Sequence, residues 1–328
     1  MPSLTDQPPP AIAAQLNALE QVLSQATGAG GVPSKAADRV TIATWNIREL
    51  GRFTSKWNAA SKDTPKRDLR SLLYIATILS RFDVIAVQEL QGYTSAFLEL
   101  LGYLNHLAGH DRWRGVASDS NRNSEDEPDE RLSYIYDSDR LILSGLVGEV
   151  VLPESQFKQI SPKRLLRQFA RTPYAVGFRP RFGAGNEFIL VTLHVAWKDA
   201  PLREFEVRRV AEWIDMWSQE PQTWDADIIT LGDFNIDRIE SEAYEPFSEL
   251  LTIPAAMHEF PRTIFASGKD KHYDQIAWIA NGNFSLQFED CGWFDHETLL
   301  RPGYGVGTTS YSFRVSDHYP MWATFSNV

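Results

Sequence analysis

Acidic, amide and imidazole side chains stand at the ends of several apolar segments in this 328-residue chain, and these residue types can carry out hydrolysis. The segment LGDFNID, residues 231–237, presents Asp233 and Asn235 directly after a run of β-forming residues. A turn needs only glycine and one Asp or Asn, and this segment has three such polar residues. Turn formation alone therefore does not explain all of them. We assign Asp237 to ordinary turn chemistry and treat Asp233 and Asn235 as ligand-binding candidates.

Other polar residues occupy the same kind of position. Taken singly, each is explained by a cap or a turn, because polar residues are common where strands meet loops. As a group they favour a site, because strand ends at one edge of a sheet converge on a crevice where ligands bind. The further members of the group are Asn46, Glu89, His194, Asp274, Asp317 and His318.

This group is rich in oxygen donors and contains no cysteine. Hard oxygen ligands suit Mg²⁺, Mn²⁺ or Ca²⁺, whereas a structural zinc site uses thiolates or several imidazoles. Carboxylates gathered without a cation raise one another's pKa, and a divalent ion removes that repulsion. We therefore predict Mg²⁺ or Mn²⁺ as the cofactor, with Ca²⁺ as an additional ion.

His194 and His318 complete a chemical arrangement. A histidine beside such a centre can take a proton from attacking water or give one to a leaving group. A carboxylate bonded to the other ring nitrogen fixes the tautomer and stabilises the cation, and Asp274 and Glu130 are available for this purpose. The other histidines are expected at the surface or in loops: His106, His110, His258, His272 and His296.

The elements that must position these residues alternate along the chain from residue 40 onward. β-α units mixed with successive strands predict an α/β fold with mixed sheets and helices on the outer faces. Strands are expected at 40–47, 83–90, 131–137, 174–180, 187–195, 226–235, 274–280 and 320–325, and helices at 66–82, 94–104 and 202–219. The aromatic-rich segments 291–300 and 301–313 are expected to be loops.

We divide the sequence into an N-terminal extension, residues 1–38, and a catalytic domain, residues 39–328. The extension has a short amphipathic helix, with Ile12, Leu16, Leu19 and Leu23 on one face, followed by a Gly-rich linker. The helix either docks on the main domain or mediates self-association through residues 11–26. No obligate protein partner is evident.

Bulk properties narrow the class of protein. No apolar window is long enough to cross a bilayer, and the N-terminus lacks the pattern of a secretion signal. Cys291 is the only cysteine, so no intrachain disulfide can form, and we predict a cytoplasmic location.

The net charge of −11 argues against a protein that binds nucleic acid through charge alone, but an acidic metal-binding cleft can still cut a polyanion. The basic stretch at 163–171 is a candidate contact for backbone phosphates.

The motifs WNI, QE, LH, GDFN, YDQI and SDHYP occur in that order, and together they resemble the endonuclease/exonuclease/phosphatase superfamily. The resemblance covers the chain from about residue 40 to residue 325 and is strongest to the deoxyribonuclease I branch. It implies a deoxyribonuclease-I-like four-layer α/β sandwich, with two mixed β-sheets packed face to face. It also implies a metal-dependent hydrolase, most similar to a nuclease that cuts DNA to 5′-phosphate and 3′-hydroxyl ends.

The resemblance also implies a role for each matched residue. Metal binding falls on Asn46, Glu89 and Asp317, with Asp233 and Asn235 positioning the phosphate, the water or a second ion. Catalytic proton transfer falls on His194 and His318, whose carboxylate partners are Glu130 and Asp274 respectively. Phosphate contacts fall on Arg171 and Arg48.

Two departures keep other functions open. Gln91 and Pro128 stand where deoxyribonuclease I has an arginine and a tyrosine that contact the DNA groove, which weakens the case for duplex DNA. The alternative from the same chemistry is a phosphatase or phospholipid diesterase acting on a small or lipid-borne phosphate. A non-catalytic binding domain is the alternative from another class, but every core motif position is filled.

Overall fold

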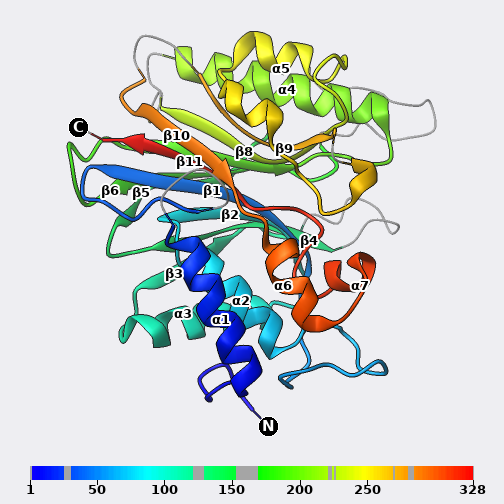
Figure 1. The fold of residues 1–328 in the computed structure, drawn as a ribbon. Helices are drawn as coiled ribbons and strands as arrows, with labels where there is room; N and C mark the ends of the chain where they lie inside the picture. Colours follow the sequence, from blue (N-terminus) through cyan, green and yellow to red (C-terminus); the bar gives the residue numbers. More distant parts are fainter. Residues whose placement is uncertain are drawn as a thin grey trace.

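The structure is a computed structural model, and it describes residues 2–25, 31–120, 129–152, 169–220, 224, 227–268, 270–279 and 284–327. Two mixed β-sheets pack face to face, and helices cover both outer faces (Figure 1). The predicted four-layer α/β sandwich is confirmed. Among the described helices, none has the length and apolar character needed to cross a membrane.

The first sheet has six strands in the order β10-β11-β1-β2-β4-β3. β1 and β2 run parallel, whereas the other neighbours are antiparallel. Its strands are β1 (Arg39–Leu50), β2 (Val84–Gln91), β3 (Trp113–Ala117), β4 (Glu130–Asp137), β10 (Gln287–Trp293) and β11 (Met321–Ser326).

The second sheet has five strands in the order β5-β6-β7-β8-β9, and only β7 and β8 run parallel. Its strands are β5 (Leu141–Glu149), β6 (Tyr174–Pro180), β7 (Phe188–His194), β8 (Ile228–Ile236) and β9 (His272–Trp278). The described helices are α1 (Pro10–Leu23), α2 (Leu69–Leu79), α3 (Ser95–Ala108), α4 (Ala200–Gln219), α5 (Glu245–Leu250), α6 (His296–Tyr304) and α7 (Thr308–Ser312), with short 3₁₀ turns η2 (Ala255–Glu259) and η3 (Ala266–Gly268).

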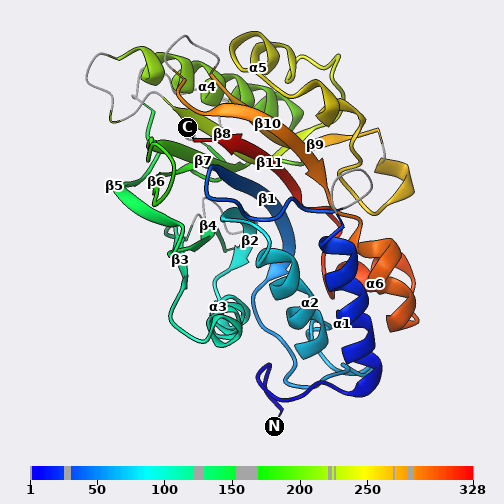
Figure 2. The ribbon, with the colours of Figure 1, turned by 60° about the vertical axis from the view of Figure 1, so that its left-hand side comes forward.

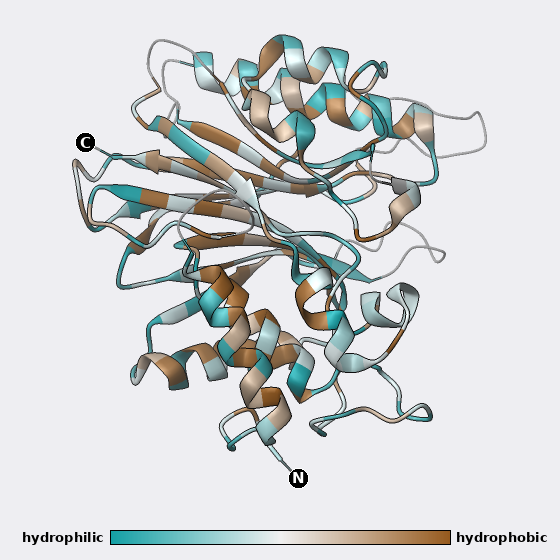
Figure 3. Cartoon of the chain, viewed as in Figure 1, coloured by the Kyte–Doolittle hydropathy of each residue, from teal (hydrophilic) through white to brown (hydrophobic). Residues whose placement is uncertain are grey.

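Alternate residues of the central strands face opposite layers. In β1, Ile42 joins the apolar cluster between the two sheets, whereas Ala43 and Trp45 join the cluster under α2. In β7, Leu190 faces the other sheet and Val191 faces α4. Strands buried on both faces are apolar along most of their length, which produces the brown stretches through the centre of the sandwich (Figure 3).

Helix α1 lies against α2 and α6 (Figure 2). Its Ile12, Leu19 and Leu23 are buried in the same cluster as α2. Gln15 donates from Nε2 to the Leu300 carbonyl over 3.1 Å and accepts from the Tyr74 hydroxyl over 2.6 Å. In this chain the helix therefore docks on the main domain. Self-association through residues 11–26 and the division at residues 38/39 stay predictions, and residues 26–30 of the Gly-rich linker lie outside the described part.

Several elements differ from the sequence expectation. The segments 291–300 and 301–313 are not loops, because they contain the end of β10, helix α6 and helix α7. The sequence pattern also missed β3, β5 and the start of β10. β3 and β10 are edge strands of the first sheet and β5 is an edge strand of the second. Edge strands bury less of their surface, so they carry a weaker apolar signal than central ones.

Candidate active site

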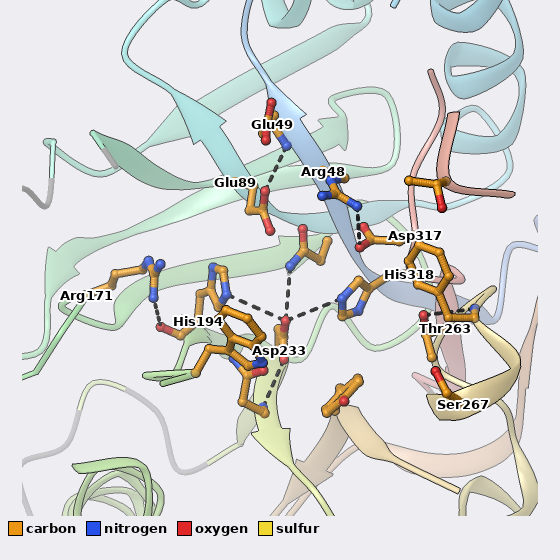
Figure 4. Close-up of a pocket in the computed structure, with 16 residues that line it drawn as sticks. Arg48, Glu49, Glu89, Arg171, His194, Asp233, Thr263, Ser267, Asp317 and His318 are labelled. Carbon is orange, nitrogen blue, oxygen red and sulfur yellow. Dashed lines mark hydrogen bonds and ion pairs between the residues drawn. The ribbon is translucent and has the colours of Figure 1, made fainter. Parts of the chain in front are cut away.

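Strand ends from both sheets meet at one edge of the sandwich, and the candidate residues stand there (Figure 4). They are Asn46 of β1, Glu89 of β2, Glu130 of β4, His194 of β7, Asp233 and Asn235 of β8, Asp274 of β9, and Asp317 and His318 just before β11. A cavity of about 580 Å³ opens at this edge. Every candidate named from the sequence lines it except Glu130 and Asp274, which are buried and bonded to the two histidines.

The backbone around this cavity is strained. Glu49, Glu89 and Asn235 have φ angles of 47°, 61° and 50°, and they are the non-glycine residues with positive φ in the described part of the chain. All three line the cavity. Positive φ is uncommon for glutamate, and strain of this kind gathers at functional sites. Beside them Gly232 has φ 148°, and a Cβ there would lie 2.2 Å from the Leu193 carbonyl oxygen, so only glycine lets β8 approach β7 here.

Asp233 lies at the centre of the site (Figure 4). Its Oδ2 accepts a hydrogen bond from Asn46 Nδ2 at 3.0 Å, so a residue of the first sheet contacts one of the second. The same oxygen lies 3.6 Å from His194 Nε2 and 3.8 Å from His318 Nε2. Its Oδ1 accepts from the Asn235 backbone N–H at 2.9 Å. Two imidazoles therefore face one carboxylate from opposite sides.

His194 is oriented by Glu130, whose Oε1 lies 2.6 Å from Nδ1. The other oxygen of Glu130 accepts from Arg171 Nε. Burial alone would raise the pKa of Glu130, but His194 and Arg171 outweigh it and lower the pKa to about 2. Burial and Arg171 oppose protonation of His194, yet Glu130 and Asp233 leave its pKa raised. The Nδ1 of His194 is thus committed to Glu130, and Nε2 is the nitrogen that faces the cavity.

His318 is oriented in the same manner by Asp274, with 2.7 Å between its Nδ1 and Asp274 Oδ2. Burial raises the pKa of Asp274 to about 6. Although burial disfavours the charged imidazole, Asp274 and Asp233 raise the pKa of His318 well above its usual value. The main chain is also held, because the His318 carbonyl accepts from Trp45 Nε1 at 2.8 Å. Each histidine therefore has its own carboxylate partner and presents Nε2 to Asp233.

The oxygens that could hold a cation are those of Asn46, Glu89 and Asp317. Asn46 Oδ1 is buried and has no hydrogen-bond partner, so it is a donor oxygen left open for a ligand. Burial raises the pKa of Glu89, a cost that a nearby cation would offset. Within the described residues, no three His, Cys, Asp or Glu side chains are grouped as metal ligands. Mg²⁺ is bound by oxygen ligands, keeps several waters and uses one or two carboxylates. The residues present fit a divalent ion of this type.

The two arginines expected to contact phosphate both line the cavity. Arg48 donates to Asp317 Oδ2 at 3.0 Å, and its guanidinium lies 3.9 Å from the centre of the Phe313 ring. Arg171 is bonded to Glu130. The rest of the basic stretch, residues 163–168, lies outside the described part.

Arg67 is a residue that the sequence interpretation missed. Its guanidinium is fully buried and donates to four backbone carbonyls. The acceptors are Arg48 at 2.6 Å, Glu49 at 2.7 Å, Arg314 at 3.1 Å and Val315 at 3.1 Å. Burial lowers its pKa to about 10. Arg67 thereby ties the end of β1, which carries Asn46, to the segment that leads into Asp317 and His318. The Lys-Arg-Asp string before α2 gave no signal for this role.

Two other residues depart from the sequence expectation. Asp237 is not limited to turn chemistry, because its carboxylate binds Arg203 at 2.8 Å and Lys271 at 2.7 Å. His296 is not at the surface, because it is completely buried at the start of α6. Its Nε2 must carry the hydrogen, since its partner at 2.9 Å is the His318 carbonyl oxygen, and its Nδ1 lies 2.9 Å from the Tyr311 hydroxyl. His296 therefore supports the backbone of His318.

Stability should fall in mild acid partly because of His296. Burial lowers its pKa from 6.5 to about 4, so between these values the unfolded chain binds a proton that the folded chain does not. The contribution of this group to the free energy of unfolding is therefore complete above pH 6.5. It decreases by about 3 kcal/mol as the pH falls toward 4. We expect His296→Gln to remove that part of the pH dependence. Urea unfolding of both proteins at pH 7 and pH 4 measures it, and equal losses in the two proteins would contradict this explanation.

Comparison with known proteins places these observations in a family context. No protein-family model matches the chain. Deoxyribonuclease-1 of Equus caballus is 27% identical over 289 residues, which covers 86% of this chain and 91% of that protein. The predicted resemblance is confirmed. The protein is similar to deoxyribonuclease I along most of its length, and the reaction class of these relatives is hydrolysis of phosphoester bonds.

Solved structures of the superfamily share the fold. An endonuclease/exonuclease/phosphatase family protein from Bacteroides thetaiotaomicron superimposes with a TM-score of 0.55 at 17% identity, covering 88% of this chain and 94% of that one. A mannosyl-6-phosphatase from the same species gives a TM-score of 0.51 at 17% identity, covering 87% of this chain and 98% of that one. At such identities the likeness concerns the fold alone.

Proposed function

We propose that the protein is a divalent-metal-dependent phosphodiester hydrolase, and specifically a nuclease that cuts DNA to 5′-phosphate and 3′-hydroxyl ends. One observation carries the proposal: two histidines, each bonded to its own carboxylate, face Asp233 at 3.6 Å and 3.8 Å in one cavity. Hydrolysis of a phosphodiester requires one proton to be removed from water and another to be given to the leaving oxygen. Two oriented imidazoles meet that requirement.

Asn46, Glu89 and Asp317 would hold one Mg²⁺ or Mn²⁺. Such an ion, when bound, neutralises charge on the phosphoryl oxygens and on the leaving oxygen. Ca²⁺ as an additional ion stays a prediction. Asp233 and Asn235 would position the phosphate, the attacking water or a second ion, because both residues line the cavity and Asp233 lies between the two histidines.

The histidines act through Nε2, because Nδ1 of each is held by a carboxylate. One Nε2 accepts a proton from water as the water oxygen bonds to phosphorus. The other donates a proton to the 3′ oxygen as the P–O3′ bond breaks. Glu130 and Asp274 stabilise the imidazolium formed on either side, which is the function of a carboxylate partner in such pairs. Arg171 and Arg48 would supply positive charge to the phosphate.

A second function draws on a specific observation, the limited size of the cavity. A volume of about 580 Å³ is within the range of small-ligand pockets, which suits a phosphatase or phospholipid diesterase on a small or lipid-borne phosphate. Inorganic phosphate released from monoesters, without cleavage of DNA, would favour this alternative.

Removal of the metal is expected to abolish cleavage. Purified protein with Mg²⁺ or Mn²⁺ should nick plasmid DNA and shorten linear duplexes and single strands, and excess EDTA should stop the reaction because Asn46, Glu89 and Asp317 would then hold no ion. Re-addition of Mg²⁺ should restore it. The cleaved ends should be substrates for a ligase, which joins only 5′-phosphate to 3′-hydroxyl. Cleavage that continues in EDTA would overturn the metal-dependent mechanism.

A further inference from the structure

Trp197 is an exposed aromatic residue at the mouth of the cavity. It follows His194 by three positions, its relative exposure is 64%, and it lines the cavity. Other large aromatic residues with high exposure in the described part are Tyr93, Trp224 and Phe288, and none of these lines the cavity. An exposed indole lacks the stabilisation that burial would provide. Its position beside the candidate catalytic residues therefore suggests a role in binding.

The main chain that carries Trp197 is fixed at three consecutive residues. Val195 N–H donates to the Asp233 carbonyl at 2.9 Å. Ala196 N–H donates to the buried carboxylate of Glu206 at 2.8 Å. The Trp197 carbonyl accepts from Arg203 Nη1 at 2.8 Å. The backbone is thus bound to β8 and α4, while the side chain extends outward.

The same arginine links this segment to the residues that lead into β9. Arg203 also binds Asp237, and Asp237 binds Lys271, two residues before Tyr273. Tyr273 lines the cavity, and its ring centre lies 5.9 Å from that of His318. Trp197 and Tyr273 are therefore joined through a chain of ion pairs on the second-sheet side of the site. That linkage ties the backbone of Trp197 to the residues that lead into β9.

We infer that Trp197 is a stacking platform for an unpaired base next to the scissile phosphate, so that the preferred substrate is a nucleic-acid strand with unstacked bases. This deepens the proposed nuclease function and rests on it. An aromatic face beside a phosphate-binding groove accepts any base, because every base has a π face. Bases inside a duplex are already stacked and cannot reach such a platform. A single strand or a frayed end can.

A lipid surface fits the same residue less well. Binding in a membrane interface uses several apolar side chains together, helped by basic residues. Here the other aromatic residues of the cavity, Phe265 and Tyr273, are partly buried. One protruding indole is better suited to a single base than to a bilayer.

The test compares binding with cleavage. Binding is measured by fluorescence anisotropy of a fluorescein-labelled oligothymidine of about twelve nucleotides in EDTA, so that it does not depend on catalysis. Hydrolysis is measured in Mg²⁺ on the same strand, on its duplex and on a strand of the same length made of abasic sites, which keeps the phosphodiesters but has no aromatic ring. The variants are Trp197→Ala and Trp197→Phe. The matched control is Trp224→Ala, which removes an indole that is 55% exposed and does not line the cavity.

Trp197→Ala is expected to weaken binding of the single strand about tenfold and to raise its KM by a similar factor. Hydrolysis of the abasic strand should stay unchanged, Trp197→Phe should keep most of the binding, and Trp224→Ala should behave as the wild type. Equal binding of the single strand by Trp197→Ala and the wild type would overturn the inference, as would equal losses of hydrolysis on all three substrates. Base-dependent binding without cleavage by the wild type would instead refute the proposed nuclease and keep the stacking platform.

Discussion

Replacing His318 or His194 with alanine is expected to lower kcat for phosphodiester hydrolysis at least a hundredfold. Each substitution removes an imidazole whose Nε2 faces Asp233 and whose Nδ1 is held by a buried carboxylate. General acid–base groups of this kind contribute about 10²–10⁴ in rate. Initial rates on bis(p-nitrophenyl) phosphate and on a DNA strand measure the loss. The double variant should lose much less than the product of the two single losses, because both groups serve one reaction.

His110→Ala is the control for these variants. His110 also pairs with an aspartate, with 2.8 Å between its Nε2 and Asp139, but the pair is exposed and does not line the cavity. Its replacement should leave kcat unchanged. Retention of more than about a tenth of the wild-type rate by both His194→Ala and His318→Ala would refute the assigned roles.

Replacing Arg67 with methionine is expected to lower the free energy of unfolding by about 3 kcal/mol or more. Methionine fills part of the space but donates no hydrogen bond, so four carbonyl oxygens that now accept from the guanidinium lose that donor. Each buried polar group left unsatisfied costs about 1–3 kcal/mol. Urea unfolding measures the change. Activity should fall as well, because Arg67 holds the segments on either side of the site together.

Arg179→Met is the matched control for Arg67, since Arg179 is exposed on β6 and pairs with Glu187 at 3.5 Å. It should change stability by a few tenths of a kcal/mol at most. Arg67→Lys should lie between the two, because one ammonium group cannot reach all four carbonyls. If Arg67→Met unfolds at the same urea concentration as the wild type, the hydrogen bonds from Arg67 to the four carbonyls contribute nothing to stability.

The strands that carry the candidate site were predictable because each is buried on both faces. Residues 40–47 and 187–195 read as strands from their apolar runs, and the polar residue that ends each run, such as His194, marks where the strand reaches the edge of the sandwich. The candidate catalytic residues could be identified for the same reason, because a carboxylate or imidazole at the end of an apolar run differs from its neighbours. Convergence of strand ends then brought these residues together.

The supporting residues were not predictable in this way. Arg67 lies in a polar string and acts on backbone carbonyls, which no side-chain pattern reveals. His296 is buried only because α6 packs against Trp45 and the loop before β11. Trp197 could have been a core residue by composition, and its exposure depends on where the fold places segment 195–197, whose backbone is bound to β8 and α4. Such roles depend on tertiary contacts between segments far apart in the sequence.

The contact between Asn46 and Asp233 has a consequence for the order of folding and activity during synthesis of the chain. The first belongs to one sheet and the second to the other, so neither sheet alone assembles the constellation. Under the proposed mechanism, a growing polypeptide gains phosphodiesterase activity only after His318 has emerged and the two sheets have closed on each other. Catalytic competence would then appear only at the final step of folding, and prematurely terminated chains would be inert.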